Sequence, residues 1–576
     1  MADFDLVIRN GRVIDGSGAP GFVADVAIAG DRIVAVGAVD GGGAEEIDAA
    51  GRLVVPGFVD IHTHFDGQAI WESRLAPTSW HGATTMVMGN CGVGFAPVRE
   101  SDRDSLIALM EGVEDIPNPC LAVGLDWAWE SFPDYLEAVE RRTHDADLCA
   151  LLPHAAVRLY VMGERALRLE AATDEDIARM REIAAEAMRR GALGFSTSRT
   201  IGHKTLAGDP VPTLRATEKE LTAIAMGMAD AGHGVLEAIS DWDSPDVDSE
   251  FAMFRRVVEA SGRPALISVT QRYHQPEVWR RLLELTREAM ADGLPMRAVV
   301  APRPIGILFG LEGTQNPFSG TRTYRSIAHL PLDERVKRMR DPEIRARILS
   351  EDPAELSTFA LLSRLSNERV FRFGNPPDYA PPRDQSVAEI ARREGRRPEE
   401  VAYDMLLEDD GRAILFAPVV NYLDYNLDAC RDMITDPAAL YGLGDGGAHV
   451  GFITDASFPT FLLAHWTRDA GVLSVETVIH RLTRANAEAV GLLDRGLVAP
   501  GMKADINIVD LEAMRMHKPY LVHDLPAGGT RLMQKADGFI ATIVSGKVTY
   551  RGGEETEHLP GRLVRGPQPA PAVVAA

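Results

Sequence analysis

Residues 54–67 read VVPGFVDIHTHFDG, in which an apolar, β-branched run ends in the pattern His62-Thr63-His64. Side chains at positions i and i+2 of a strand project to the same face, whereas residues two apart on a helix do not face each other. The spacing therefore predicts a strand end from which two imidazoles project together while Thr63 points away. Paired imidazoles are a natural start for a metal site, although a surface hairpin with two polar histidines shows the same short pattern.

The composition of the 576-residue chain is that of an ordinary soluble protein, long enough for a large core and more than one domain. Its formal net charge of -24 argues against non-specific binding to nucleic acid or to an anionic membrane. No apolar run reaches membrane-spanning length, the N-terminus lacks a signal-peptide pattern, and four cysteines make no disulfide framework. We expect a cytoplasmic enzyme with no nucleic-acid or membrane partner, and the sequence leaves its oligomeric state open.

The pattern of the sequence divides the chain into several parts. Residues 1–56 read as short strands with tight turns, including a hairpin signal at Asn10-Gly11, and residues 497–553 return to this pattern. Residues 57–496 alternate strand-like and helix-like runs, which is typical of βα units around a parallel sheet. These patterns predict a (β/α) barrel with a small β-sandwich built from both chain ends, followed by a poorly packed, extended tail at 554–576.

One long segment interrupts the barrel pattern. Residues 302–412 are rich in proline, arginine and acidic residues and have little strand character. They indicate an insertion after a late barrel strand, which is either a lid or a set of ordinary surface helices. Residues 414–417 and 441–445 then restore the strand pattern.

Four side chains that can bind a metal fall at the ends of predicted strands: His62, His64, Cys91 and Asp445. Functional groups of a parallel barrel gather at the C-terminal strand ends, and each of these residues follows an apolar run and precedes a glycine-rich loop. Two imidazoles, a thiolate and a carboxylate form a suitable zinc set. Taken alone, Cys91 would be a buried structural thiol and Asp445 a cap or turn residue, but their glycine neighbours favour a site role.

Such a set suits hydrolysis of an amide or a related C–N bond. Zinc makes hydroxide available near neutral pH and can polarise a carbonyl group. A carboxylate within reach of the attacking water can take its proton and later pass it to a leaving amine. Asp445 is our candidate for this acid/base role.

Several stretches resemble the amidohydrolase superfamily, and the resemblance covers nearly the whole chain outside residues 302–412. The superfamily stretches are Ile8-Arg-Asn-Gly11, residues 55–64, Asp445, and the sequence PGMKAD at residues 500–505. More narrowly, the chain resembles the N-acyl-D-amino-acid deacylases in GNCG at 89–92, in residues 153–163 and in GALGFST at 191–197.

The resemblance implies a zinc-dependent hydrolase of N-acyl-D-amino acids with a distorted (β/α)8 TIM-type barrel and a β-sandwich. In that family the counterparts of His62, His64 and Cys91 bind metal. The counterpart of Asp445 is the catalytic acid/base and can also touch the metal. If all four residues bound a tetrahedral zinc, no position would remain for water, so Asp445 would leave during turnover or the coordination would expand.

The chain departs from the family at two middle strands, each of which carries a metal-binding histidine in the relatives. Here residues 235–241 read VLEAISD and residues 266–272 read LISVTQR, without histidine. The possible substitutes, none of which matches residue for residue, are Glu237, Asp241, Gln271 and the nearby His274. We therefore expect one zinc ion, and the usual second site is in question.

Substrate recognition by a deacylase requires a group that holds a carboxylate, and arginine does this well in bidentate geometry. Arg199, His203 and Lys204 follow a predicted strand, where a loop should overhang the pocket, and Arg303 follows another strand. His449, four residues after Asp445, is a further candidate. The alternatives are a solvated basic loop for residues 199–204 and a loop hydrogen bond for His449.

Three functions remain open from the sequence. The first is hydrolysis of N-acyl-D-amino acids or related small amides. The second is hydrolysis of a cyclic amide or imide, motivated by the missing histidines and the altered loop around Arg199. The third is a barrel that lost catalysis and binds a ligand or partner, against which the joint presence of His62, His64, Cys91 and Asp445 argues.

Overall fold

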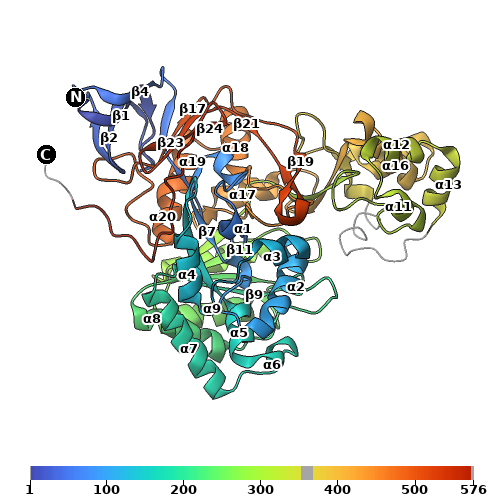
Figure 1. The fold of residues 1–576 in the computed structure, drawn as a ribbon, viewed down its shortest axis with the longest axis horizontal. Helices are drawn as coiled ribbons and strands as arrows, with labels where there is room; N and C mark the ends of the chain where they lie inside the picture. The colour runs from blue at the N-terminus through green and yellow to red at the C-terminus, as the bar shows by residue number, and fades with distance from the viewer. Residues whose placement is uncertain (1, 352–366, 573–576) are drawn as a thin grey trace.

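A curled parallel sheet of eight strands forms the centre of the molecule (Figure 1). The structure is a computed structural model that describes residues 2–351 and 367–572. The strands lie in chain order from β6 to β12, with β16 beyond β12. They are β6 (Phe58–Asp60), β7 (Ala83–Met88), β8 (Asp147–Pro153), β9 (Gly194–Arg199), β10 (Val235–Ser240), β11 (Ala265–Val269), β12 (Met296–Val300) and β16 (Ala439–Tyr441).

The first and last strands of this sheet approach each other. Asn486 donates hydrogen bonds from its side-chain amide to the carbonyl oxygens of Val59 on β6 and Tyr441 on β16, both at 2.9 Å. The loops that follow these two strands also meet, because Thr63 and Gly446 form a parallel bridge. The sheet is therefore a distorted (β/α)8 barrel, and the predicted fold class is confirmed.

Helices fill the connections between the barrel strands, and none in the described part of the chain is long and apolar enough to cross a membrane. The helix α7 begins with a capping box, in which Thr173 Oγ1 accepts the N–H of Asp176 at 3.2 Å and Asp176 accepts the N–H of Thr173 at 2.8 Å. The helices are α1 (Gln68–Trp71), α2 (Arg103–Glu114), α3 (Asn118–Gly124), α4 (Phe132–Glu140), α5 (His154–Met162), α6 (Glu164–Leu167), α7 (Asp174–Arg189), α8 (Glu218–Ala231), α9 (Val247–Ser261), α10 (Val278–Ala291), α17 (Asp428–Thr435), α18 (Phe458–Phe461), α19 (Val475–His480) and α20 (Asn486–Ala489).

A nine-stranded sheet combines both ends of the chain. Strand β17 (Ile506–Val509) pairs antiparallel with β5 (Leu53–Pro56), which joins the C-terminal part to the N-terminal part. The other strands of this sheet are β1 (Phe4–Val13), β2 (Phe22–Ala29), β3 (Arg32–Gly37), β4 (Gly43–Asp48), β22 (Phe539–Val544), β23 (Lys547–Arg551) and β24 (Glu554–Glu555). Two small sheets pair β18 (Arg515–Met516) with β21 (Ala536–Asp537) and β19 (Tyr520–Leu525) with β20 (Gly529–Met533).

The hairpin expected at Asn10-Gly11 is wrong, because β1 passes through these residues as one strand. The pairing of β1 with β2 shifts register between Ile8 and Gly11, and Asn10 has a φ of 55°. A Cβ atom at Gly11 would lie 2.4 Å from Cγ2 of Val54. The Asn-Gly pair therefore makes an irregularity inside a strand, where it lets a neighbouring strand approach closely.

Residues from 305 to 420 contain a separate three-stranded antiparallel sheet with its own hydrophobic core. The expectation of little strand character is wrong for β13 (Ile305–Gly310), and the predicted strand at 414–417 belongs to this sheet rather than to the barrel. Figure 1 shows its helices beside the barrel on the right. The elements are β13, β14 (Phe371–Arg372), β15 (Ile414–Val420), α11 (Arg322–Ile327), α12 (Leu332–Met339), α13 (Pro342–Ser350), α15 (Val387–Glu394) and α16 (Pro398–Leu406).

The C-terminal tail is extended, but the expected poor packing is wrong for part of it. Leu563 and Val564 are buried. The N–H of Val564 donates to the carbonyl oxygen of Leu148 at 2.7 Å, and the N–H of Leu148 donates to the carbonyl oxygen of Arg562 at 3.0 Å. The tail therefore runs beside the start of β8 and covers part of the barrel.

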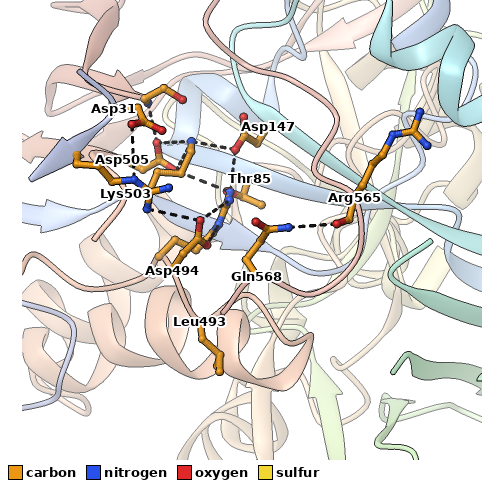
Figure 2. A network of polar contacts seen from close by, with 12 residues as sticks. Asp31, Thr85, Asp147, Leu493, Asp494, Lys503, Asp505, Arg565 and Gln568 are labelled. Atoms are coloured by element: carbon orange, nitrogen blue, oxygen red, sulfur yellow. Dashed lines mark hydrogen bonds and ion pairs between the residues drawn. The ribbon is translucent and has the colours of Figure 1, made fainter. Parts of the chain in front are cut away.

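A buried network of charges joins the barrel to the segment that leads into β17 (Figure 2). The amine of Lys503 is 2.8 Å from Asp147 and 2.9 Å from Asp505. Arg495 contacts the same Asp147 oxygen at 2.9 Å and donates to the hydroxyl of Thr85 at 2.8 Å. Because all these groups are withdrawn from water, each charge depends on its partners for compensation.

Candidate metal centre and active site

The two histidines of the HxH pattern lie directly after β6, and both are buried. Their ring centroids are 5.5 Å apart. Thr63 turns away from them, since its hydroxyl donates to the carbonyl oxygen of Val87 at 2.8 Å. The strand end thus presents His62 and His64 to one point, as the spacing predicts.

Cys91 reaches the histidines from a tight turn immediately after β7. Its Sγ lies 3.3 Å from Nε2 of His62. The turn starts at Gly89, which has a φ of 83°, and a Cβ atom there would lie 2.4 Å from the carbonyl oxygen of Leu151. Only glycine fits this turn without displacing the neighbouring strand.

Asp445 approaches the same point from the loop after β16. Its Oδ1 lies 3.3 Å from Nε2 of His62 and 3.7 Å from Nε2 of His64. Cys91 and the two histidines each offer a ligand atom within 4.8 Å of the others. The structure therefore brings together the four side chains that the sequence singled out.

The chemistry of these side chains fits a zinc ion. Imidazole nitrogens, a thiolate and a carboxylate oxygen are the donors that zinc takes in proteins. Within the described part of the chain, Oδ1 of Asp445 is buried and has no hydrogen-bond partner, although it lies between His62 and His64. A divalent cation held by these groups would supply the partner that this oxygen lacks.

Burial and mutual charge shift the pKa values of this cluster. Burial raises the pKa of the Glu237 carboxyl to about 8. Burial lowers the pKa of His64, but the carboxylates of Glu114 and Asp445 outweigh this effect and raise the pKa to about 9. Burial alone would raise the pKa of Asp445, yet the imidazoles of His64 and His62 hold it well below its usual value. Asp445 is therefore ionised at neutral pH and can accept a proton.

Two buried carboxylates adjoin the histidines on the side away from Asp445. Glu237, on β10, accepts the N–H of Cys91 at 2.9 Å, and its other oxygen lies 3.9 Å from Nδ1 of His62. Glu114, the last residue of α2, places Oε1 3.3 Å from Nδ1 of His64. From the sequence, Glu237 was predicted only as a substitute for a missing metal-binding histidine, and Glu114 was not predicted.

Of the other substitutes considered for the missing histidines, Asp241 and Gln271 bind loop residues instead. Asp241 accepts hydrogen bonds from Thr200 at 2.6 Å and from Arg272 at 2.7 Å. The side-chain oxygen of Gln271 accepts the N–H of Leu423 at 3.1 Å, and His274 is exposed. Among the four substitutes, Glu237 is the residue with contacts to the metal-binding side chains in the described structure.

The two arginines predicted to hold a substrate carboxylate are already paired within the protein. Arg199 contacts Glu250 at 2.9 Å. Arg303 is buried, contacts Asp455 at 3.0 Å, and stacks over the ring of Tyr379 with 3.9 Å to its centroid. Each guanidinium therefore already has one carboxylate neighbour within the described structure.

The remaining predicted substrate residues lie on loops around the cluster. His203 shares a 2.9 Å hydrogen bond with the hydroxyl of Ser198, and burial, helped by the charge of His449, lowers its pKa to about 3. Nε2 of His449 lies 3.6 Å from Oε2 of Glu114. Lys204 has no side-chain hydrogen bond or ion pair with any residue that the structure describes.

A model of the amidohydrolase family matches residues 45–550. The chain belongs to the amidohydrolase family. This amidohydrolase is 27% identical over 511 residues to D-aminoacylase of Alcaligenes xylosoxydans xylosoxydans. The alignment covers 88% of each protein. It is 27% identical over 568 residues to N-acyl-D-glutamate deacylase of the same organism, covering 97% of this chain and 96% of the relative. The predicted family is therefore confirmed.

The fold of this amidohydrolase is also seen in a solved structure of N-acyl-D-glutamate deacylase from Bordetella bronchiseptica. That protein was crystallised with zinc and a phosphonate inhibitor that mimics the tetrahedral intermediate. The two structures superpose with a TM-score of 0.64 at 20% sequence identity, and the superposition covers 98% of this chain and 99% of the neighbour. At this identity it supports the shared fold.

Proposed function

We propose that this amidohydrolase is a zinc-dependent deacylase of N-acyl-D-amino acids. His62, His64 and Cys91 would hold one zinc ion, and Asp445 would act as the acid/base and touch the metal. The observation that carries the proposal is the meeting of Asp445 Oδ1 with Nε2 of both histidines, at 3.3 and 3.7 Å. The substrate class is supported by the names of the relatives, D-aminoacylase and N-acyl-D-glutamate deacylase.

The reaction would add water to the amide carbonyl and release a carboxylic acid and an amine. A bound zinc ion supplies hydroxide near neutral pH and polarises the carbonyl group. Asp445, ionised beside the imidazoles, takes the proton of the attacking water. When the C–N bond breaks, the same carboxyl group gives that proton to the leaving nitrogen. Three protein ligands leave room for water, which favours Asp445 as a proton carrier over a permanent fourth ligand.

Lys204 is our first candidate for holding the substrate carboxylate. Its ammonium is unpaired within the described residues, whereas Arg199 and Arg303 are committed to Glu250 and Asp455. The loop that carries Lys204 packs against α2, because a Cβ atom at Gly112 would overlap the carbonyl oxygen of Lys204. Glu114, at the end of the same helix, contacts His64. We retain His203 and His449 as substrate-contacting residues.

A second activity, hydrolysis of a cyclic amide or imide, is favoured by one specific observation. Both arginines expected to bind a free carboxylate, Arg199 and Arg303, already form ion pairs inside the protein. A substrate without a carboxylate would need neither of them. We place this activity second because the relatives that match over most of the chain are named as deacylases.

The test of function is a substrate panel on the purified protein. We expect amine release from N-acetyl-D-amino acids and much slower release from the L-enantiomers, because a site shaped around one hand misplaces the other relative to Asp445. Hydantoin, dihydrouracil and succinimide serve as the cyclic arm of the panel. Faster opening of a cyclic compound than cleavage of every N-acyl-D-amino acid would reverse the order of the two proposals, and no hydrolysis at all would refute both.

We further propose that the enzyme works in the cytoplasm on small molecules, without a nucleic-acid partner. All four cysteines, Cys91, Cys120, Cys149 and Cys430, are free and buried, which suits a reducing compartment. The strongly negative net charge disfavours nucleic acid.

A further inference from the structure

We propose that Glu237 and Glu114 are positioning residues that orient the imidazoles of His62 and His64 for metal binding. The proposal rests on the metal centre proposed above. Each imidazole has one nitrogen on the side of Asp445 and the other on the side of a buried carboxylate. The two carboxylates come from different elements, β10 and the end of α2. The same arrangement therefore occurs once at each ring.

Glu237 connects the first histidine to the turn that carries the thiol. It is 2% exposed. One of its oxygens accepts the N–H of Cys91 at 2.9 Å, and the other lies 3.9 Å from Nδ1 of His62 without a hydrogen-bond partner in the described structure. A single side chain therefore sets both the position of Cys91 and the electrostatic surroundings of His62.

Glu114 connects the second histidine to the loop that carries Asp445. It is 1% exposed, with Oε1 3.3 Å from Nδ1 of His64 and Oε2 3.6 Å from Nε2 of His449. Its carbonyl oxygen accepts the N–H of His449. The next residue, Asp115, accepts the N–H of Gly451 at 3.1 Å. The end of α2 is thus fastened at several points to the loop after β16.

These two side chains lie beside Nδ1 of each ring, and neither Nδ1 has another hydrogen-bond partner in the described structure. When a ring binds a cation through Nε2, it carries its single proton on Nδ1, where the buried acid can accept it. The lone pair is then on Nε2, which in both rings lies on the side of Asp445. Removing such a partner typically weakens metal binding 10- to 100-fold because the ring loses its preferred tautomer and orientation.

The experiment replaces each carboxylate by a side chain of similar shape that accepts no hydrogen bond. Metal-free Glu114→Met and Glu237→Met proteins are titrated with cobalt(II), and the thiolate-to-cobalt absorption band reports binding through Cys91. We expect the dissociation constant for cobalt to rise about 10- to 100-fold in each variant. The Glu114→Gln and Glu237→Gln variants keep an acceptor oxygen and are expected to lose affinity, but less than the methionine variants.

Glu220→Met is the matched control. Glu220 is also a fully buried carboxylate beside a histidine, with 2.9 Å to His154 and 2.8 Å to Arg158, but it has no contact with the four metal-site residues. We expect this variant to unfold at a lower temperature and to bind cobalt as the unaltered protein does. A general loss of stability would therefore not imitate the expected result.

Unchanged cobalt affinity in folded Glu114→Met or Glu237→Met would overturn the role of that residue. If a methionine variant does not fold, the glutamine variant decides, and a dissociation constant equal to that of the unaltered protein refutes the proposal. Equal weakening by Glu220→Met would also refute it. Failure of the unaltered chain to bind cobalt would instead refute the metal centre, so the two failures are distinguishable.

Discussion

Asp445→Asn is expected to retain the metal but to lower kcat about 10²- to 10⁴-fold, the usual contribution of a general acid/base. Asparagine preserves the shape of the side chain but cannot take a proton from water or return it to the leaving amine. The loss should appear in kcat for every substrate that the enzyme cleaves, since the step is common to all amides. Initial rates and the metal content of the same preparation give both quantities.

The matched control for this prediction is Asp455→Asn, on the same loop. Asp455 is buried and pairs with Arg303 at 3.0 Å rather than with the two histidines. We expect it to affect stability more than kcat. Normal turnover in Asp445→Asn would contradict the acid/base role, and equal losses of kcat in both variants would show that any change in this loop disturbs the site.

Lys503→Met is expected to lower the free energy of unfolding by about 3–5 kcal/mol, the usual cost of breaking a buried ion pair. Lys503 is fully buried and contacts both Asp147 and Asp505. Without its ammonium, these two carboxylates would remain buried with Arg495 as their main compensating charge. Because the network joins the barrel to the segment before β17, the loss should loosen the contact between the two parts. Denaturant-induced unfolding measures the effect.

Lys518→Met provides the comparison, because Lys518 also forms an ion pair at 2.9 Å, with Asp409. That aspartate side chain is 66% exposed, so water compensates its charge when the lysine is lost. We expect a change of about 0–1 kcal/mol. If both substitutions cost the same small amount, the buried network would not stabilise the fold as described.

The alternation of side chains along a strand made the first half of the site predictable. His62 and His64 could be paired from their spacing alone, because a strand places alternate residues on one face. The location of Cys91 and Asp445 at strand ends followed from the rule that a parallel barrel gathers its functional groups at one rim. The contribution of both chain ends to one sheet was also predictable from their matching strand patterns.

Other features depend on contacts between distant segments, which periodicity does not encode. Glu114 lies two helical turns after Ile107 and one turn after Met110, on the buried face of α2. The one sequence feature that could have indicated its role is that it is an acidic residue on an otherwise apolar helix face. The ion pairs of Arg199 with Glu250 and of Arg303 with Asp455 link residues 51 and 152 positions apart. Proximity to a predicted strand end therefore could not show that these guanidinium groups were already neutralised.

The small sheet within residues 305–420 was hidden for a related reason. Its strand β13 pairs with β15, more than a hundred residues later, and these strands pack on a core of their own. Nothing in residues 305–310 distinguishes such a strand from an apolar stretch of loop until its partner is known. Their composition indicated an insertion, while the pairing required the structure.

The most direct test of the account is the metal content of the purified chain, measured together with its hydrolytic activity before and after chelation. We predict one zinc-class ion per chain, loss of amine release when it is removed, and recovery when zinc is restored. Full activity in protein stripped of metal would contradict the central claim that His62, His64, Cys91 and Asp445 form a catalytic metal centre.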